Sequence, residues 1–149
     1  MQGECRNLYY NARRTAGLTQ ERWAEALGIS VESVRLYESG ANMPSDEIAL
    51  RMAEVAGQQI ICYWHLLQKS KAAAQLLPQL EKRPLPESVL TLLVKLKDFL
   101  HGGMQDMARI AADGHVDETE RKAYNSAMQQ LRELLAAGMC VEFGEEDIG

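Results

Sequence analysis

Three histidines are the residues of this sequence whose chemistry would most readily support catalysis or metal binding. His65, His101 and His115 have no metal-ligand spacing to one another or to the three cysteines. No cysteine stands in a Cys-x-x-Cys pair, and no Ser-His-Asp or Cys-His arrangement can be recognised from residue spacing. We therefore expect no enzyme, with no catalytic residue, no metal site and no cofactor.

The densest acidic segment, residues 113–120, has the composition of a cation-binding loop but not its pattern. It lacks the alternating oxygen ligands, central glycine and final glutamate of a twelve-residue calcium loop. Asp113-Gly114 predicts a turn, and Asp117 with Glu120 predicts a capping box at the start of a helix. We interpret the segment as structural.

The composition predicts an all-α protein. The chain has 149 residues, four prolines and 46% hydrophobic residues, and it is rich in the residue types that lose least in a helix. No apolar stretch approaches the length of a membrane span and no signal pattern opens the chain, so we expect a cytoplasmic protein without membrane contact. The odd number of widely spaced cysteines favours buried free thiols: Cys5, Cys62 and Cys140.

Apolar residues recur at helical spacing throughout the first half of the chain. Caps and glycines divide this half into four helices, at about residues 4–16, 19–28, 30–38 and 45–57. A fifth helix, residues 59–77, is apolar nearly all round at its start, which indicates burial on more than one side. Trp23 is expected in the core, where its indole N–H needs a hydrogen-bond partner.

The second half has a different organisation. Pro78, Pro84 and Pro86 mark a linker at residues 78–86. Residues 87–138 are predicted to form a helical hairpin whose first helix reaches Ile110, with a kink or break at Gly102-Gly103, and whose last helix ends at Gly138. The tail, residues 139–149, is expected to be flexible.

The run from Gly17 to Ser30, followed by Ser33 to Gly40 and Pro44, carries the most specific signal in the chain. Its glycines, its Thr-Gln pair and its Tyr-Glu-x-Gly ending resemble the Cro/repressor class of helix-turn-helix proteins, the xenobiotic response element family. The resemblance implies a repressor-like five-helix DNA-binding domain in residues 1–77, with its core in residues 4–57. It also implies a sequence-specific transcriptional regulator, a repressor of bacterial, phage or mobile-element type.

In this family the third helix lies in the DNA major groove and the second crosses the backbone. By position, the resemblance implies that Val31, Glu32 and Leu36 read base edges: glutamate accepts from a cytosine amino group, and apolar side chains contact a thymine methyl. It also implies that Arg13 pairs with Glu38 as a structural ion pair. The residues expected at the DNA backbone are polar side chains near helix ends: Gln20, Ser30, Ser33, Arg35, Ser39 and Asn42.

Double-stranded DNA is the expected partner, and proteins of this family usually bind two-fold symmetric sites as dimers. We therefore expect a homodimer in which residues 86–137 take part, whereas no residue pattern identifies a small-molecule effector. The net charge of −5 opposes DNA binding, and residues 1–57 carry six arginines against eight acidic residues, a net charge of −2. The alternative hypothesis is a protein-interaction module, such as an antitoxin-like subunit, with weak DNA binding.

Overall fold

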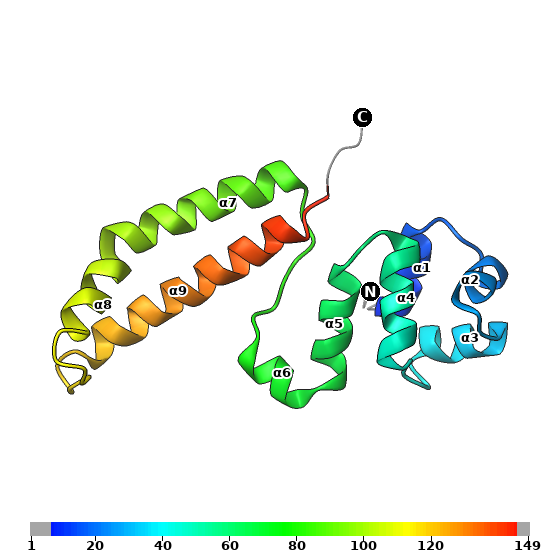
Figure 1. Ribbon diagram of the computed structural model, residues 1–149, viewed down its shortest axis with the longest axis horizontal. Helices are drawn as coiled ribbons and strands as arrows, with labels where there is room; N and C mark the ends of the chain where they lie inside the picture. Colours follow the sequence, from blue (N-terminus) through cyan, green and yellow to red (C-terminus); the bar gives the residue numbers. More distant parts are fainter. Residues whose placement is uncertain (1–6, 146–149) are drawn as a thin grey trace, which may run out of the picture. The chain divides into compact units, whose positions relative to one another are not determined.

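The computed structural model describes residues 7–145, which form two compact units; in the sequence, the first ends at Leu77 and the second begins at Pro78. The chain is all-helical in the described range, as predicted, apart from one isolated bridge between Pro84 and Glu145. No helix in that range is long and apolar enough to cross a membrane. The first unit contains six helices (Figure 1): α1 Leu8–Thr15, α2 Gln20–Leu27, α3 Val31–Ser39, α4 Asp46–Ala56, α5 Ile60–Lys69 and α6 Lys71–Leu76.

Side-chain caps and left-handed glycines set the boundaries of α2, α3 and α4. Thr19, Ser30 and Ser45 each accept a hydrogen bond from the backbone N–H three residues later, which satisfies one of the free donors of the first turn. Gly28 and Gly40 end α2 and α3 with φ of 68° and 77°, a conformation that other residues adopt only at a cost. These caps confirm the predicted helix boundaries in this part of the chain.

The core of the first unit is built from one face of each of the first five helices. Trp23 and Leu27 of α2 are completely buried and pack with apolar residues of α1, α3, α4 and α5. The prediction that Trp23 belongs to the core is confirmed. Its indole N–H, however, is buried without a hydrogen-bond partner. The remaining buried members of this cluster are Leu8, Tyr9, Ala12, Ala24, Val34, Met52, Ala53 and Ile61.

Two helices of this unit, the first and the fifth, differ in their bounds from the prediction. The first helix begins at Leu8, where the Asn7 side chain caps it by accepting from the Tyr9 N–H; residues 4–6 of the predicted helix lie outside the described residues. The predicted single fifth helix is interrupted at Ser70, whose backbone is extended at φ −117° and ψ 112°. The Ser70 hydroxyl caps a separate short helix, α6, by accepting from the Ala73 N–H.

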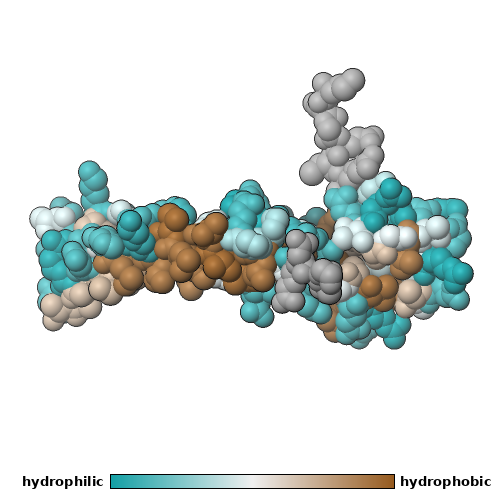
Figure 2. All heavy atoms as spheres, turned by 90° about the horizontal axis from the view of Figure 1, so that it is seen from above, coloured by the Kyte–Doolittle hydropathy of each residue, from teal (hydrophilic) through white to brown (hydrophobic). Residues whose placement is uncertain are grey.

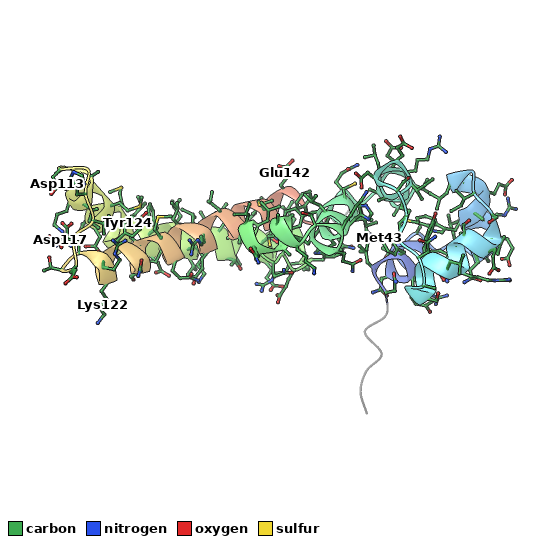
Figure 3. All side chains as sticks on the ribbon, turned by 90° about the horizontal axis from the view of Figure 1, so that it is seen from below. Met43, Asp113, Asp117, Lys122, Tyr124 and Glu142 are labelled. Carbon is green, nitrogen blue, oxygen red and sulfur yellow. The ribbon has the colours of Figure 1, made fainter. Side chains whose placement is uncertain are left out.

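The second unit is an antiparallel helical hairpin (Figure 1). Its first arm comprises α7 (Leu85–Asp98), a π-helical turn η1 (Phe99–Gly103) and α8 (Met104–Ile110), and its second arm is α9 (Arg121–Glu142). The π turn lies at the predicted glycine pair, where the Gly103 N–H donates to Gln130 Oε1 of α9 at 3.1 Å. Asp113 and Asp117 lie at the closed end of the hairpin, whereas Glu142, the last residue of α9, lies toward its open end (Figure 3).

The two reciprocal bonds of the predicted capping box are present: Asp117 Oδ1 accepts from the Glu120 N–H, and Glu120 Oε2 accepts from the Asp117 N–H. They lie in the turn before α9, which starts at Arg121 with Glu120 as its N-cap and without a side-chain cap. The prediction for the C-terminal end of the hairpin is wrong. The last helix continues through Gly138, which keeps negative φ, to Glu142, so residues 139–142 of the predicted flexible tail are helical. Residues 146–149 lie outside the described residues.

The proline-containing segment before α7 is attached to this C-terminal end. The Leu85 N–H donates to the Glu145 carbonyl, Lys82 pairs with the Glu145 carboxylate, and Leu80 is buried. The helix α7 also starts inside the predicted linker, at Leu85, with Pro86 in its first turn. Much of residues 78–86 is therefore an ordered part of the hairpin unit.

Candidate nucleic-acid interface

The helices α2 and α3 meet across the short turn of Gly28, Ile29 and Ser30. The left-handed Gly28 turns the chain, Ile29 packs against the core, and the Ser30 hydroxyl opens α3 by accepting from the Ser33 N–H. Arg51 of α4 donates to the Leu27 carbonyl at 3.1 Å, which satisfies one of the last carbonyls of α2. The two helices are thus held in a fixed helix-turn-helix geometry by caps at the turn and by a hydrogen bond from α4.

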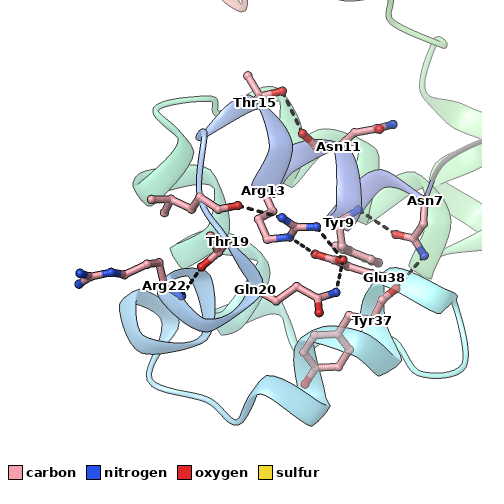
Figure 4. Close-up of polar contacts among 11 residues, drawn as sticks. Asn7, Tyr9, Asn11, Arg13, Thr15, Thr19, Gln20, Arg22, Tyr37 and Glu38 are labelled. Carbon is pink, nitrogen blue, oxygen red and sulfur yellow. Dashed lines mark hydrogen bonds and ion pairs between the residues drawn. The ribbon is translucent and has the colours of Figure 1, made fainter.

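A nearly buried ion pair connects α1 to the end of α3 (Figure 4). Arg13 Nε donates to Glu38 Oε1 at 2.5 Å and Nη2 donates to Oε2 at 3.1 Å, with side chains 8% and 7% exposed. Arg13 Nη1 also donates to the Leu18 carbonyl at 2.8 Å. The hydrogen bonds to Glu38 raise the pKa of Arg13. The guanidinium therefore holds α1, the α1–α2 turn and α3 together in one geometry.

Gln20, the first residue of α2, joins the same network. Its Nε2 donates to Glu38 Oε2 at 2.9 Å, so the carboxylate accepts from both Arg13 and Gln20 (Figure 4). The side-chain amide has a second N–H, and the first turn of α2 presents further free backbone donors. This arrangement orients the amide at the N-terminus of the helix, where an anionic oxygen is favoured.

The exposed side of α3 carries the predicted base-reading positions. Glu32 and Arg35 are both exposed and form an ion pair with 3.7 Å between the carboxylate and guanidinium atoms. Leu36 is 38% exposed, whereas Val31 is half-buried and packs against the core. Glu32, Arg35 and Leu36 are thus accessible on this face. Val31 is only partly accessible, because part of its side chain packs against the core.

The serines and the asparagine predicted at the DNA backbone make local hydrogen bonds. The Ser30 and Ser33 hydroxyls are 2.9 Å apart. The Ser39 hydroxyl donates to the Leu36 carbonyl at 3.0 Å, and Asn42 Oδ1 accepts from the Met43 N–H at 2.9 Å. These bonds shape the start of α3 and the loop that follows it, and they leave several polar atoms of the same groups exposed.

The cations of this surface stand beside carboxylates. Arg35 pairs with Glu32, and Arg22 pairs with Glu25 at 3.4 Å, with both partners of each pair largely exposed. Exposed pairs of this kind are weak, about 0.2 to 1 kcal/mol, so the phosphate of a bound DNA can compete for either arginine. The interface therefore offers hydrogen-bond donors, and arginines that can leave their carboxylate partners for a phosphate. It does not have a strongly positive field.

Sequence reasoning missed a second polar network in this unit, which leads from the buried Tyr9 and His65 to the exposed Asp46. The Tyr9 hydroxyl and His65 Nδ1 are 2.9 Å apart, and His65 Nε2 lies 3.0 Å from Asp46 Oδ1. Burial raises the pKa of Tyr9 to about 12. In the imidazole tautomer that donates from Nε2 to the Asp46 carboxylate, Nδ1 accepts from the phenol. The partners are 56 and 19 residues apart in sequence, and no local pattern connects them.

The fold and the arrangement of α2 and α3 define a helix-turn-helix DNA-binding domain. Residues 10–59 match a family model described as Helix-turn-helix, and this domain is of the Cro/repressor type, in the xenobiotic response element family of DNA-binding regulators. The match covers most of α1 and all of α2, α3 and α4, about a third of the chain. Comparison with curated proteins and with solved structures gives no match.

Proposed function

We propose that this protein is a sequence-specific transcriptional repressor of bacterial, phage or mobile-element type, which acts by occupying a promoter. The observation that carries the proposal is the helix-turn-helix itself, with α3 fixed to α1 and α2 through Arg13, Glu38 and Gln20. A rigidly held α3 presents Glu32 and Leu36 outward, which a helix in the major groove requires.

The proposed contacts divide into positioning and readout. Gln20 and the first backbone amides of α2 would hold one phosphate, while Ser30, Ser33, Arg35, Ser39 and Asn42 would contact the backbone around α3. Glu32 would accept from a cytosine amino group, and Leu36 and the exposed part of Val31 would contact thymine methyl groups. None of these three side chains can make the bidentate contact that an arginine or asparagine makes with a base, so each half-site should be read with modest specificity.

We further propose that the protein binds DNA as a homodimer through its helical hairpin. Large apolar side chains of the hairpin are exposed, among them Leu93 at 55% and Leu135 at 58%. Figure 2 shows such side chains gathered in a continuous patch on this unit. Exposed patches of this kind mark interaction sites, and a second hairpin is a complementary partner that would complete a four-helix bundle.

The alternative is a protein-interaction module, such as an antitoxin-like subunit, that kept the fold and lost tight DNA binding. The charge favours this alternative, because residues 1–57 carry a net charge of −2 where DNA-binding domains usually have an excess of cations. In that case the partner protein would supply the missing contacts.

Selection of bound sequences from random double-stranded DNA at low salt separates the two hypotheses. Enrichment of a two-fold symmetric motif, with affinity that falls as salt rises, is the expected result. Glu32→Ala should relax the preference at one position of the motif, whereas the control Glu54→Ala, an exposed residue of α4, should leave the motif unchanged. If no motif is enriched, the regulator proposal fails.

A further inference from the structure

The hairpin unit contains a cavity of about 270 Å³ between its two arms. Ser88, Thr91 and Lys95 of α7 form one wall, and residues of α9 including Ala137 form the other. The ordered segment before α7, through Glu81 and Arg83, lines the same space. Three parts of the unit therefore contribute to one site, which lies outside the helix-turn-helix.

Ser88 is the feature of this cavity that points to a ligand. Its side chain is completely buried, and its hydroxyl has no hydrogen-bond partner in the protein. Buried polar groups are almost always paired, because an unpaired hydroxyl loses its bonds to water without replacement. A ligand with a polar group at the cavity wall would supply the missing bond.

The neighbouring polar groups are already engaged within the protein. The Thr91 hydroxyl donates to the Glu87 carbonyl at 2.9 Å, and the Cys140 thiol donates to the Glu81 carbonyl at 3.6 Å. The Thr91 oxygen keeps lone pairs that can accept from a ligand. The opposite wall includes Ala136 and Ala137, whose side chains are small.

The charges around the cavity are balanced. Lys95 pairs with Glu133 at 2.7 Å, and Arg83 pairs with Glu81 at 2.7 Å. Their hydrogen bond raises the pKa of Lys95 and lowers that of Glu133, so both groups are charged at neutral pH. A ligand with a single charge can bond to only one member of each pair, whereas a ligand with both charges can bond to both members and extend the pairs into a network.

The size of the cavity limits the ligand further. A volume of 270 Å³ corresponds to about nine water molecules at the density of the liquid. It is at the lower end for ligand pockets in proteins. This is the space of a small metabolite and not of a nucleotide.

We propose that this cavity binds a small zwitterion of amino-acid size. The carboxylate of the ligand extends the ion pairs at Lys95 and Arg83, its ammonium group faces Glu133 and Glu81, and a polar atom of the ligand pairs with the Ser88 hydroxyl. This binding site is separate from the DNA interface and does not depend on the function proposed above.

Isothermal titration calorimetry of the full chain with each proteinogenic L-amino acid, at millimolar concentration, tests this proposal. At least one amino acid should bind, and its methyl ester and N-acetyl derivatives, which carry a single charge, should bind about tenfold more weakly or worse. Failure of every amino acid to bind, or equal binding of the singly charged derivatives, would overturn the proposal.

Two variants place the binding in this cavity. Ser88→Ala removes only the orphaned hydroxyl, so it should stay folded and weaken binding about tenfold, and Ala137→Leu should block the cavity. Ser126→Ala, an exposed serine of α9, is the matched control and should bind like the unmodified protein. Thermal melting without ligand checks that each variant is folded; binding unchanged in both folded cavity variants would show that the ligand binds elsewhere.

Discussion

The carboxylate of Glu38 accepts hydrogen bonds from two residues that lie on different helices, Arg13 and Gln20. Because Arg13 is nearly buried, its charge depends on this carboxylate and on the Leu18 carbonyl for compensation. A buried charge that loses its partner is left without water or a counter-ion, which is costly. An exposed charge that loses its partner is still solvated by water. The same type of ion pair should therefore differ in energetic importance between the interior and the surface of this domain.

Glu38→Ala should lower the free energy of unfolding of the domain by about 3 to 5 kcal/mol, because it leaves the Arg13 guanidinium buried without a counter-ion. Urea denaturation followed by circular dichroism measures the change. The control is Glu25→Ala, which removes the exposed partner of Arg22 and should cost at most about 1 kcal/mol. Equal losses in the two variants would contradict the structural role of the buried pair.

Tyr9 should make the domain less stable at alkaline pH. Its side chain is 2% exposed and burial raises its pKa to about 12, from an ordinary value of about 10. Between these values the unfolded chain releases the phenolic proton and the folded chain retains it. The buried, protonated Tyr9 therefore contributes fully to the free energy of unfolding below pH 10. This contribution is lost as the pH rises toward 12, a loss of about 2 to 3 kcal/mol.

Tyr9→Phe tests this assignment, because it removes the titrating group. The variant loses the hydrogen bond to His65 and should be less stable than the unmodified protein at pH 8, but the difference should narrow as the pH rises through the interval from 10 to about 12. Urea midpoints measured across that range give the result. A constant difference between the two proteins would show that Tyr9 does not titrate in this way.

At the scale of the helices, the sequence predicted what depends on neighbouring residues. The caps at Thr19, Ser30 and Ser45 were predictable because the accepting side chain and the donating backbone N–H lie within one turn. The break at Ser70 was not predictable, because the alanines that follow it favour a continuous helix. Whether Ser70 caps a new helix or continues the old one depends on packing. Gly138 also misled the prediction, because the glycine does not end the helix: α9, which packs along α7, continues through it to Glu142.

The candidate interface was predictable to a similar extent. The family resemblance identified Arg13 and Glu38 as partners, and the structure brings them together. The bond from Gln20 to Glu38 spans 18 residues and has no sequence signal, since a glutamine at a helix start has many possible partners. The network of Tyr9, His65 and Asp46 likewise depends on how α1, α4 and α5 pack, which a single sequence does not specify.

The π turn in the first arm of the hairpin depends on close packing at Gly103. A methyl group there would lie 2.5 Å from Gln130 Oε1 and 2.7 Å from the Phe99 ring, whereas at Gly102 the nearest atom is 3.9 Å away. Gly103→Ala would displace Gln130 and break its bond to the backbone, so we expect a loss of about 1 to 2 kcal/mol despite the better helix propensity of alanine. Chemical denaturation of the full chain measures this change.

Gly102→Ala provides the matched control for this substitution. The added methyl group meets no close neighbour, and alanine is favoured over glycine in a helix by about 1 kcal/mol, so this variant should be slightly more stable than the unmodified protein. The opposite ranking of the two variants would mean that η1 does not pack against Gln130 as described.

For the molecule as a whole, the charge makes tight binding by one helix-turn-helix difficult. The net charge of −5 and the paired arginines at the interface leave little electrostatic attraction for DNA. Two linked domains on a two-fold site bind far more tightly than one, because the second binding event is intramolecular. Dimerisation through the hairpin would therefore compensate for the weak affinity of each domain.

Leu93→Glu should convert the proposed dimer to a monomer, because it places a charge in the exposed apolar patch of the hairpin. Size-exclusion chromatography with light scattering measures the mass, and affinity for a two-fold symmetric operator should fall about 100-fold while affinity for a single half-site stays unchanged. Leu76→Glu is the matched control: this leucine of α6 is 82% exposed but belongs to the first unit, so the variant should remain dimeric. An unmodified protein that is monomeric at micromolar concentration would refute the dimer, and equal weakening at operator and half-site would instead place Leu93 outside the dimer interface.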